Sequence, residues 1–228
     1  MQQNVDIRDL VGTHVNLQFD AQSGAPTRRV VCVDPINLRR PFAYTHDEVD
    51  AACLWALLSA VEAASTRFQS DEPSKFAVEI SAAALRDPMV APALQAACVA
   101  GGSSPEAWTL VANEHVLTAL GGTAQRRLLT AKAFGFEIAL RVSPVTAIPM
   151  GTEARALFSQ IWASYGAVME ADEDPGVGLW QRLMAADRAN ASLCITDTPT
   201  IAPIDFKRLP PARTLQPRRQ PAIALWKQ

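Results

Sequence analysis

The chain has 228 residues, 49% hydrophobic and 19% charged, which is typical of a globular protein and too apolar for a disordered one. Its 21 basic and 23 acidic residues give a net charge of −2, so we expect neither a nucleic-acid partner nor a membrane-surface partner. No apolar run approaches the ~20 residues of a membrane helix, and no signal peptide is evident, which predicts a cytoplasmic protein. The cysteines form no CxxC pair and the histidines no metal-binding spacing, so we expect no cofactor and no structural metal.

Short apolar runs alternate with helical patterns along the chain. Strands are predicted at 15–19, 29–33, 76–80, 109–112, 136–142, 167–169, 192–195 and 222–225. The first helix is predicted from Thr45, because Thr45 and Glu48 form a capping box and apolar residues then recur at helical spacing as far as Ala64. Further helices are predicted from Asp87 to Gly101, from Thr123 to Phe134, from Thr152 through Ile161, and from Val177 to Ala189.

The lengths of the connections predict the fold class. The link from Asp20 to Arg28 is too short for a crossover helix, so the first two strands are expected to pair antiparallel. The later alternation of strands and helices favours a largely parallel sheet. Together these patterns predict an α/β fold, a modified (β/α)8 TIM-like barrel with an antiparallel strand near the N-terminus, in one domain over 1–228. An open doubly wound sheet is the alternative, and the Pro/Arg-rich segment 203–228 has the least defined pattern.

Three segments resemble one known family in the same order. Residues 76–88 (FAVEISAAALRDP) are similar to the segment of EAL domains, the cyclic di-GMP phosphodiesterases, that usually reads Val-Asn-Ile-Ser followed by Leu and Asp-Pro. Residues 105–114 (PEAWTLVANE) resemble the family's Leu-Glu-Ile-Thr-Glu strand, and residues 132–140 (KAFGFEIAL) its Leu-Gly-x-x-Ile-Ala-Leu strand. The resemblance is clearest over 76–142, and it implies a barrel whose first strand is antiparallel.

The resemblance also implies where the family's site would fall. Active EAL domains hold two divalent metals that bridge the phosphate, which requires several converging carboxylates or carboxamides. The name-giving Glu-Ala-Leu is absent, and its glutamate falls on Asp34. The family's phosphate-gripping arginine falls on Leu38, where Arg39 could substitute after a slip of one residue. The ligand asparagine of the next motif falls on Glu79, which can still coordinate a metal.

Two further metal positions differ more strongly from the family. The first glutamate of Leu-Glu-Ile-Thr-Glu is replaced by Val111, while Glu114 holds the place of the second. The metal-binding Asp-Asp pair is replaced by Arg141-Val142, and a permanently charged guanidinium repels cations. Metal-dependent hydrolysis is therefore expected to be absent, with no catalytic residue and no metal ligand assigned.

Five residues are then expected at the vestigial cleft: Asp34, Arg39, Glu79, Glu114 and Arg141. Two interpretations stay open. Arg141 either replaces the positive charge of a metal in a remodelled pocket, or it pairs with Glu79 or Glu114 in a relic ion-pair network.

The sequence thus predicts a protein that is not an enzyme, an EAL-like regulatory protein acting through protein contact in bacterial cyclic di-GMP-related signalling. Alternatives are a cyclic di-GMP sensor without hydrolysis, and an enzyme with altered chemistry that uses Arg141 electrostatically. A protein partner is expected, and a second copy of the chain is a further candidate. Cyclic di-GMP is expected to bind no tighter than about 10 µM, because the carboxylates of the cleft would repel its phosphates.

Overall fold

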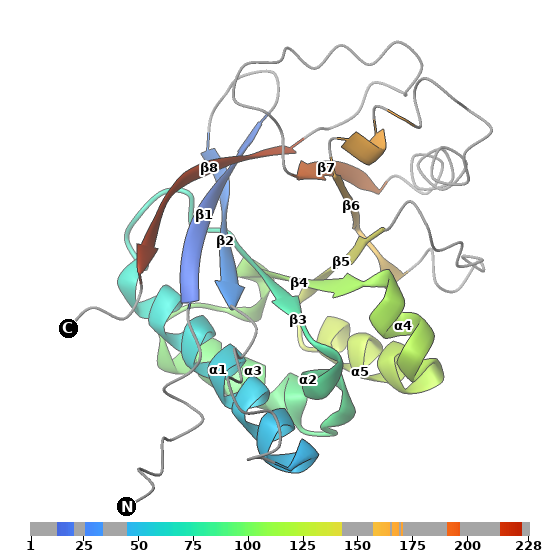
Figure 1. The fold of residues 1–228 in the computed structure, drawn as a ribbon. Coiled ribbons are helices and arrows are strands. Elements are labelled where there is room, and N and C mark those ends of the chain that lie inside the picture. Colours follow the sequence, from blue (N-terminus) through green and yellow to red (C-terminus); the bar gives the residue numbers. More distant parts are fainter. Residues whose placement is uncertain are drawn as a thin grey trace, which may run out of the picture.

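A computed structural model describes residues 13–20, 26–33, 45–142, 157–164, 166–168, 170, 191–196 and 215–224. The strands are β1 (Thr13–Asp20), β2 (Pro26–Val33), β3 (Phe76–Ile80), β4 (Trp108–Asn113), β5 (Glu137–Arg141), β6 (Gln160–Ser164), β7 (Ser192–Thr196) and β8 (Leu215–Ala224). The helices are α1 (His46–Arg67), α2 (Ala82–Arg86), α3 (Val90–Ala100), the 3-10 turn η3 (Pro105–Ala107), α4 (Glu114–Leu120) and α5 (Gly122–Ala133). Helices α1 to α5 lie along the outside of β2 to β5 (Figure 1).

The strands form one curled sheet that closes into a barrel in the order β1 to β8. β1 and β2 pair antiparallel, and β2 through β7 pair in parallel. β8 pairs antiparallel with β1 and parallel with β7, the latter through Cys194 and Leu215. The mixed α/β fold and the antiparallel first pair confirm the sequence prediction.

Helix α1 begins where its capping box predicts. The Glu48 backbone N–H donates to Thr45 Oγ1 at 3.3 Å, and the Thr45 N–H donates to Glu48 Oε2 at 2.7 Å. The apolar face of α1 packs on α2, α3 and β2 as part of the layer around the barrel. Among the described helices, α1 alone also has the length and apolar composition of a membrane span, contrary to the expectation that no segment approaches that length.

Several element predictions differ from the structure, and the helix expected through Ile161 is replaced at its end by β6. The strand expected at 167–169 is found at Gln160–Ser164, and residues 166–168 are helical, because a short apolar segment fits a helix and a buried strand equally well. The short helices α2 and α4 were not predicted, and the helix expected from Asp87 begins at Val90. β8 extends from Leu215 through two prolines that argue against a strand. The helix expected at 177–189 lies outside the described residues.

Alternate residues of each strand point into the lumen of the barrel, which they fill in layers. The middle layer is apolar and separate from the larger core between the strands and the helices. It consists of Val30, Ala77, Val111, Ala139, Trp162 and Cys194.

The layer at the amino-terminal end of the parallel strands is polar. Arg28 Nη1 donates to Gln160 Oε1 at 2.6 Å, and Arg28 Nη2 donates to Glu137 Oε2 at 3.2 Å. Thr109 Oγ1 and Gln160 Nε2 also donate to Glu137 Oε2, at 3.0 and 2.9 Å. Burial lowers the pKa of Arg28, and the neighbouring Glu137 opposes that shift. This polar network fills one end of the lumen, so space for a ligand is found at the other end.

Candidate functional site

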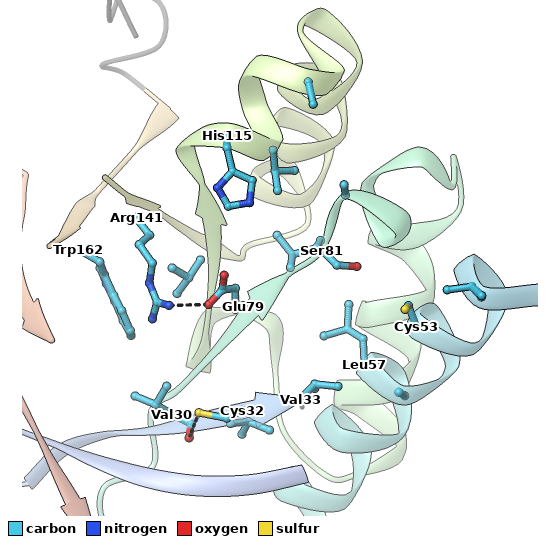
Figure 2. Close-up of a pocket in the computed structure, with 18 residues that line it drawn as sticks. Val30, Cys32, Val33, Cys53, Leu57, Glu79, Ser81, His115, Arg141 and Trp162 are labelled. Atoms are coloured by element: carbon cyan, nitrogen blue, oxygen red, sulfur yellow. Dashed lines mark hydrogen bonds and ion pairs between the residues drawn. The ribbon is translucent and has the colours of Figure 1, made fainter. Parts of the chain in front are cut away.

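A cavity of about 620 Å³ opens at the carboxyl ends of the parallel strands. Strands β2 to β6, helices α1 and α4 and the start of α2 contribute its described lining (Figure 2). This end of a parallel barrel is where the strand-to-helix connections converge and where such barrels place their active sites.

An ion pair between β3 and β5, the two strands on either side of β4, lies in this cavity. Arg141, the last residue of β5, places Nη1 at 2.8 Å from Glu79 Oε2 on β3 (Figure 2). The Arg141 guanidinium also lies 5.9 Å from the ring centre of Trp162. The side chains of Arg141 and Glu79 are 36% and 42% exposed, so solvent screens the pair and its net stabilisation is small.

The structure brings together two of the five residues expected at the cleft. Glu79 and Arg141 both line the cavity and pair with each other, as one of the two sequence interpretations expected. Glu114 is fully buried as the first residue of α4 and is not among the described residues that line the cavity. Asp34 and Arg39 lie outside the described residues.

Sequence reasoning missed several cavity residues. His115 is exposed on α4, and its ring lies on the cavity side of that helix, facing Glu79 (Figure 2). Trp162 is buried, and its register opposite Arg141 could have been found only if β6 had been placed correctly. Cys32 and Cys53 also line the cavity, and both are thiols of intermediate exposure.

The two-metal centre implied by the family resemblance does not fit the described residues. Val111 is apolar, buried in the middle layer of the lumen and aligned with Glu79 across β3 and β4. The Arg141 cation already neutralises Glu79. Within the described ranges, no group of three or more His, Cys, Asp or Glu side chains could hold a metal ion.

Comparison with known proteins identifies the fold. No known protein family and no curated protein sequence matches the chain. Among solved structures, the PaMucR phosphodiesterase in complex with c-di-GMP superposes with a TM-score of 0.68 at 14% identity, over 85% of this chain and 83% of that one. The EAL domain of Mycobacterium smegmatis DcpA gives 0.62 at 15% identity, over 82% and 80%. The chain has the fold of an EAL domain.

A third EAL-type structure is similar over only part of its own length. The manganese and cyclic di-GMP complex of Klebsiella pneumoniae BlrP1 gives a TM-score of 0.64 at 10% identity, and this chain spans about half of it. These identities are low, so the comparisons show a shared fold with cyclic di-GMP phosphodiesterases.

One sequence prediction needs correction. The chain was expected not to be an enzyme, because Val111 and Arg141 replace ligand carboxylates. The comparisons contradict that prediction, since the similar EAL structures are described as a phosphodiesterase and as an EAL enzyme. The two replacements alter the described part of the site, but they do not demonstrate an inactive domain.

Proposed function

We propose that this EAL-type barrel binds a cyclic dinucleotide at the carboxyl-terminal mouth and hydrolyses one of its phosphodiester bonds. The observation that carries the proposal is Arg141, a permanent cation held in a cavity at the strand ends where such barrels bind their substrates. A guanidinium forms charge-assisted hydrogen bonds with phosphate oxygens.

Binding would rearrange the ion pair. A phosphate that takes the place of the Glu79 carboxylate on Arg141 releases Glu79 inside the same cavity. Arg141 then offsets the charge that develops on the phosphate oxygens in the transition state. Its Nε is buried without a hydrogen-bond partner among the described residues, so the guanidinium has unused donor capacity.

Two side chains of the cavity, the released Glu79 and His115, would carry the protons of the reaction. Glu79 accepts a proton from the attacking water as the water oxygen bonds to phosphorus. The bond from phosphorus to the ribose oxygen breaks, and His115 donates a proton to that oxygen as the general acid. This scheme uses no metal ion, in keeping with the poor fit of a two-metal centre to the described residues.

Calorimetry and a product assay with cyclic di-GMP test the proposal. We expect a dissociation constant near 10 µM, at least about tenfold weaker binding in Arg141→Ala, and no loss in the matched control Arg126→Ala, on the exposed face of α5. Glu79→Gln should bind but not hydrolyse. Turnover should persist in a chelator and fall in His115→Gln. Unchanged binding in Arg141→Ala, or no turnover with chelator, Mg²⁺ or Mn²⁺, would contradict the proposal.

Protein contact, the role expected from the sequence, is a second proposal. Met89 directly precedes α3, Val99 lies in its last turn, and Leu129 lies on the neighbouring α5; their exposed fractions are 61%, 64% and 47%. Large exposed apolar side chains are enriched where a partner binds. Cross-linking in a bacterial cytoplasm, the expected location, tests this role, and the double variant Met89→Glu with Val99→Glu should lose the cross-linked partner.

A further inference from the structure

The cavity passes through the sheet rather than staying inside the barrel mouth. Its lining includes Cys32 and Glu79, which share the lumen face with the middle layer. It also includes Val33 and Ile80, the residues next to them, whose side chains point to the helix side of the sheet. A cavity confined to the lumen would be lined by only one of these two sets.

The opening lies between β2 and β3. Parallel pairing of these strands ends at Val31 opposite Val78. β3 nevertheless continues to pair with β4 as far as Ile80 opposite Ala112. The last residues of β2 therefore separate from β3, and the cavity uses this gap to reach the inner face of α1 (Figure 2).

The part of the cavity beyond the gap is apolar. We call it the apolar arm and define it by Val33, Val49, Cys53, Leu57, Ile80 and Val116. The nearby Ser81 hydroxyl already accepts the Ala84 N–H at 3.2 Å, as the cap of α2. A nucleobase in the apolar arm would bury donors and acceptors without partners, which is costly, whereas a hydrocarbon chain would not.

We propose that the cavity binds an amphipathic anion, with one phosphate or carboxylate head group on Arg141 and an unbranched hydrocarbon chain in the apolar arm. The volume of about 620 Å³ lies within the range of small-molecule pockets. The positive charge of Arg141 favours an anionic head group, and the apolar lining of the arm favours a hydrocarbon chain. The site therefore suits a ligand that has both. This activity is separate from action on a cyclic dinucleotide, although both would use Arg141.

A chain-length series tests the proposal directly. Octyl, decyl and dodecyl phosphate, each below its micelle concentration, are titrated into the full chain by calorimetry. We expect about fourfold tighter binding for each CH2 group added, so about sixteenfold from one member to the next. Dodecanoate distinguishes a carboxylate from a phosphate head group. Arg141→Ala should weaken every member by the same factor, because it removes only the head-group contact.

Two measurements place the chain in the apolar arm. Cys53→Phe should reduce the dependence on chain length, and Ala51→Phe, at an exposed position of the same helix, should leave it unchanged. Alkylation of Cys53 in the unsubstituted protein should slow at least fivefold with saturating dodecyl phosphate, and this readout needs no substitution in the arm.

Affinity that does not depend on chain length, or alkylation of Cys53 that dodecyl phosphate does not slow, would overturn the inference. If alkyl phosphates fail while cyclic di-GMP still binds, the apolar arm is wrong and the proposed phosphodiesterase stands. If alkyl phosphates bind with the expected chain dependence and cyclic di-GMP does not, the inference is supported and the proposed substrate is wrong.

Discussion

An arginine meets a glutamate at both ends of the barrel lumen, in very different surroundings. At the amino-terminal end, Arg28 is 5% exposed, and it shares Glu137 and Gln160 with further donors. At the carboxyl-terminal end, Arg141 is 36% exposed, beside a cavity, and bonded to Glu79. Both pairs consist of an arginine and a glutamate. They differ in how deeply the arginine is buried and in how many hydrogen-bond partners surround the pair.

The difference separates a structural pair from one that a ligand can open. Removing one partner of a buried pair leaves a charge without solvent or partner, which is strongly destabilising. Breaking a solvent-screened pair costs little, and water or a ligand can replace the lost partner. We therefore expect the amino-terminal pair to contribute mainly to folding and the carboxyl-terminal pair mainly to binding.

The largest expected effect concerns Cys194, which lies between the two pairs in the middle layer. It is fully buried, and burial raises the pKa of its thiol well above the usual value, although Arg28 and Arg141 oppose the shift. Since the thiolate is the reactive form, maleimide should label Cys194 at least about a thousandfold more slowly in the native than in the unfolded protein. Peptide mass spectrometry gives both rates. Labelling of Cys194 as fast as Cys32 would mean that solvent enters the lumen.

The next largest effect is expected at the amino-terminal end. Arg28→Ala should lower the free energy of unfolding by about 3 kcal/mol, near the low end for a buried pair because Glu137 keeps a third of its surface in solvent. Urea denaturation measures the loss. The exposed Arg126→Ala should change stability by no more than about 0.5 kcal/mol. A loss below about 1 kcal/mol in Arg28→Ala would mean that the amino-terminal pair contributes no more to stability than a solvent-exposed pair does. That result would contradict the distinction drawn between the two ends of the lumen.

A smaller loss is expected at Gln160. Its Oε1 accepts from Arg28 Nη1 at 2.6 Å and from Trp162 Nε1 at 3.1 Å. Gln160→Leu keeps the volume but leaves both donors unpaired, so we expect about 2 kcal/mol of destabilisation in the same urea assay. A neutral effect of Gln160→Leu would show that water replaces the side chain.

The smallest effect is expected at the cavity. A double-mutant cycle with Glu79→Gln and Arg141→Ala should give a coupling of no more than about 1 kcal/mol in stability, and less at high salt. Each single variant should nevertheless change ligand binding or turnover, as proposed above. A coupling of several kcal/mol would instead identify the carboxyl-terminal pair as structural.

Short-range patterns predicted the parts of the fold that they control. The capping box of Thr45 and Glu48 fixed the start of α1, and the short Asp20–Arg28 link gave the antiparallel first pair. β6 was misplaced because Ile161 and its neighbours satisfy a helical period, and only pairing with β5 and β7 selects a strand. β8 is longer than predicted. It includes Pro217, a residue that argues against a strand, because pairing with β1 outweighs that local preference.

The same limit applies to the site. Glu79 and Arg141 were predicted together because each falls in a segment that resembles a known motif. Glu114 falls in such a segment too, but its burial depends on how α4 packs, which no local pattern encodes. His115 and Cys53 reach the cavity because two strands separate and two helices line the opening. These are tertiary features. Predicting them from one sequence would require knowing which residues of neighbouring strands pair with each other.

The reversed direction of β1 has a practical consequence for engineering. Thr13 at the start of β1 lies opposite Val33 at the end of β2, and His14 lies opposite Ala224 at the end of β8. The first and last strands of the barrel therefore meet at the ligand-binding end. A circularly permuted fluorescent protein joined to these two strands would sit beside the cavity, where occupancy of the site could be converted into an optical signal.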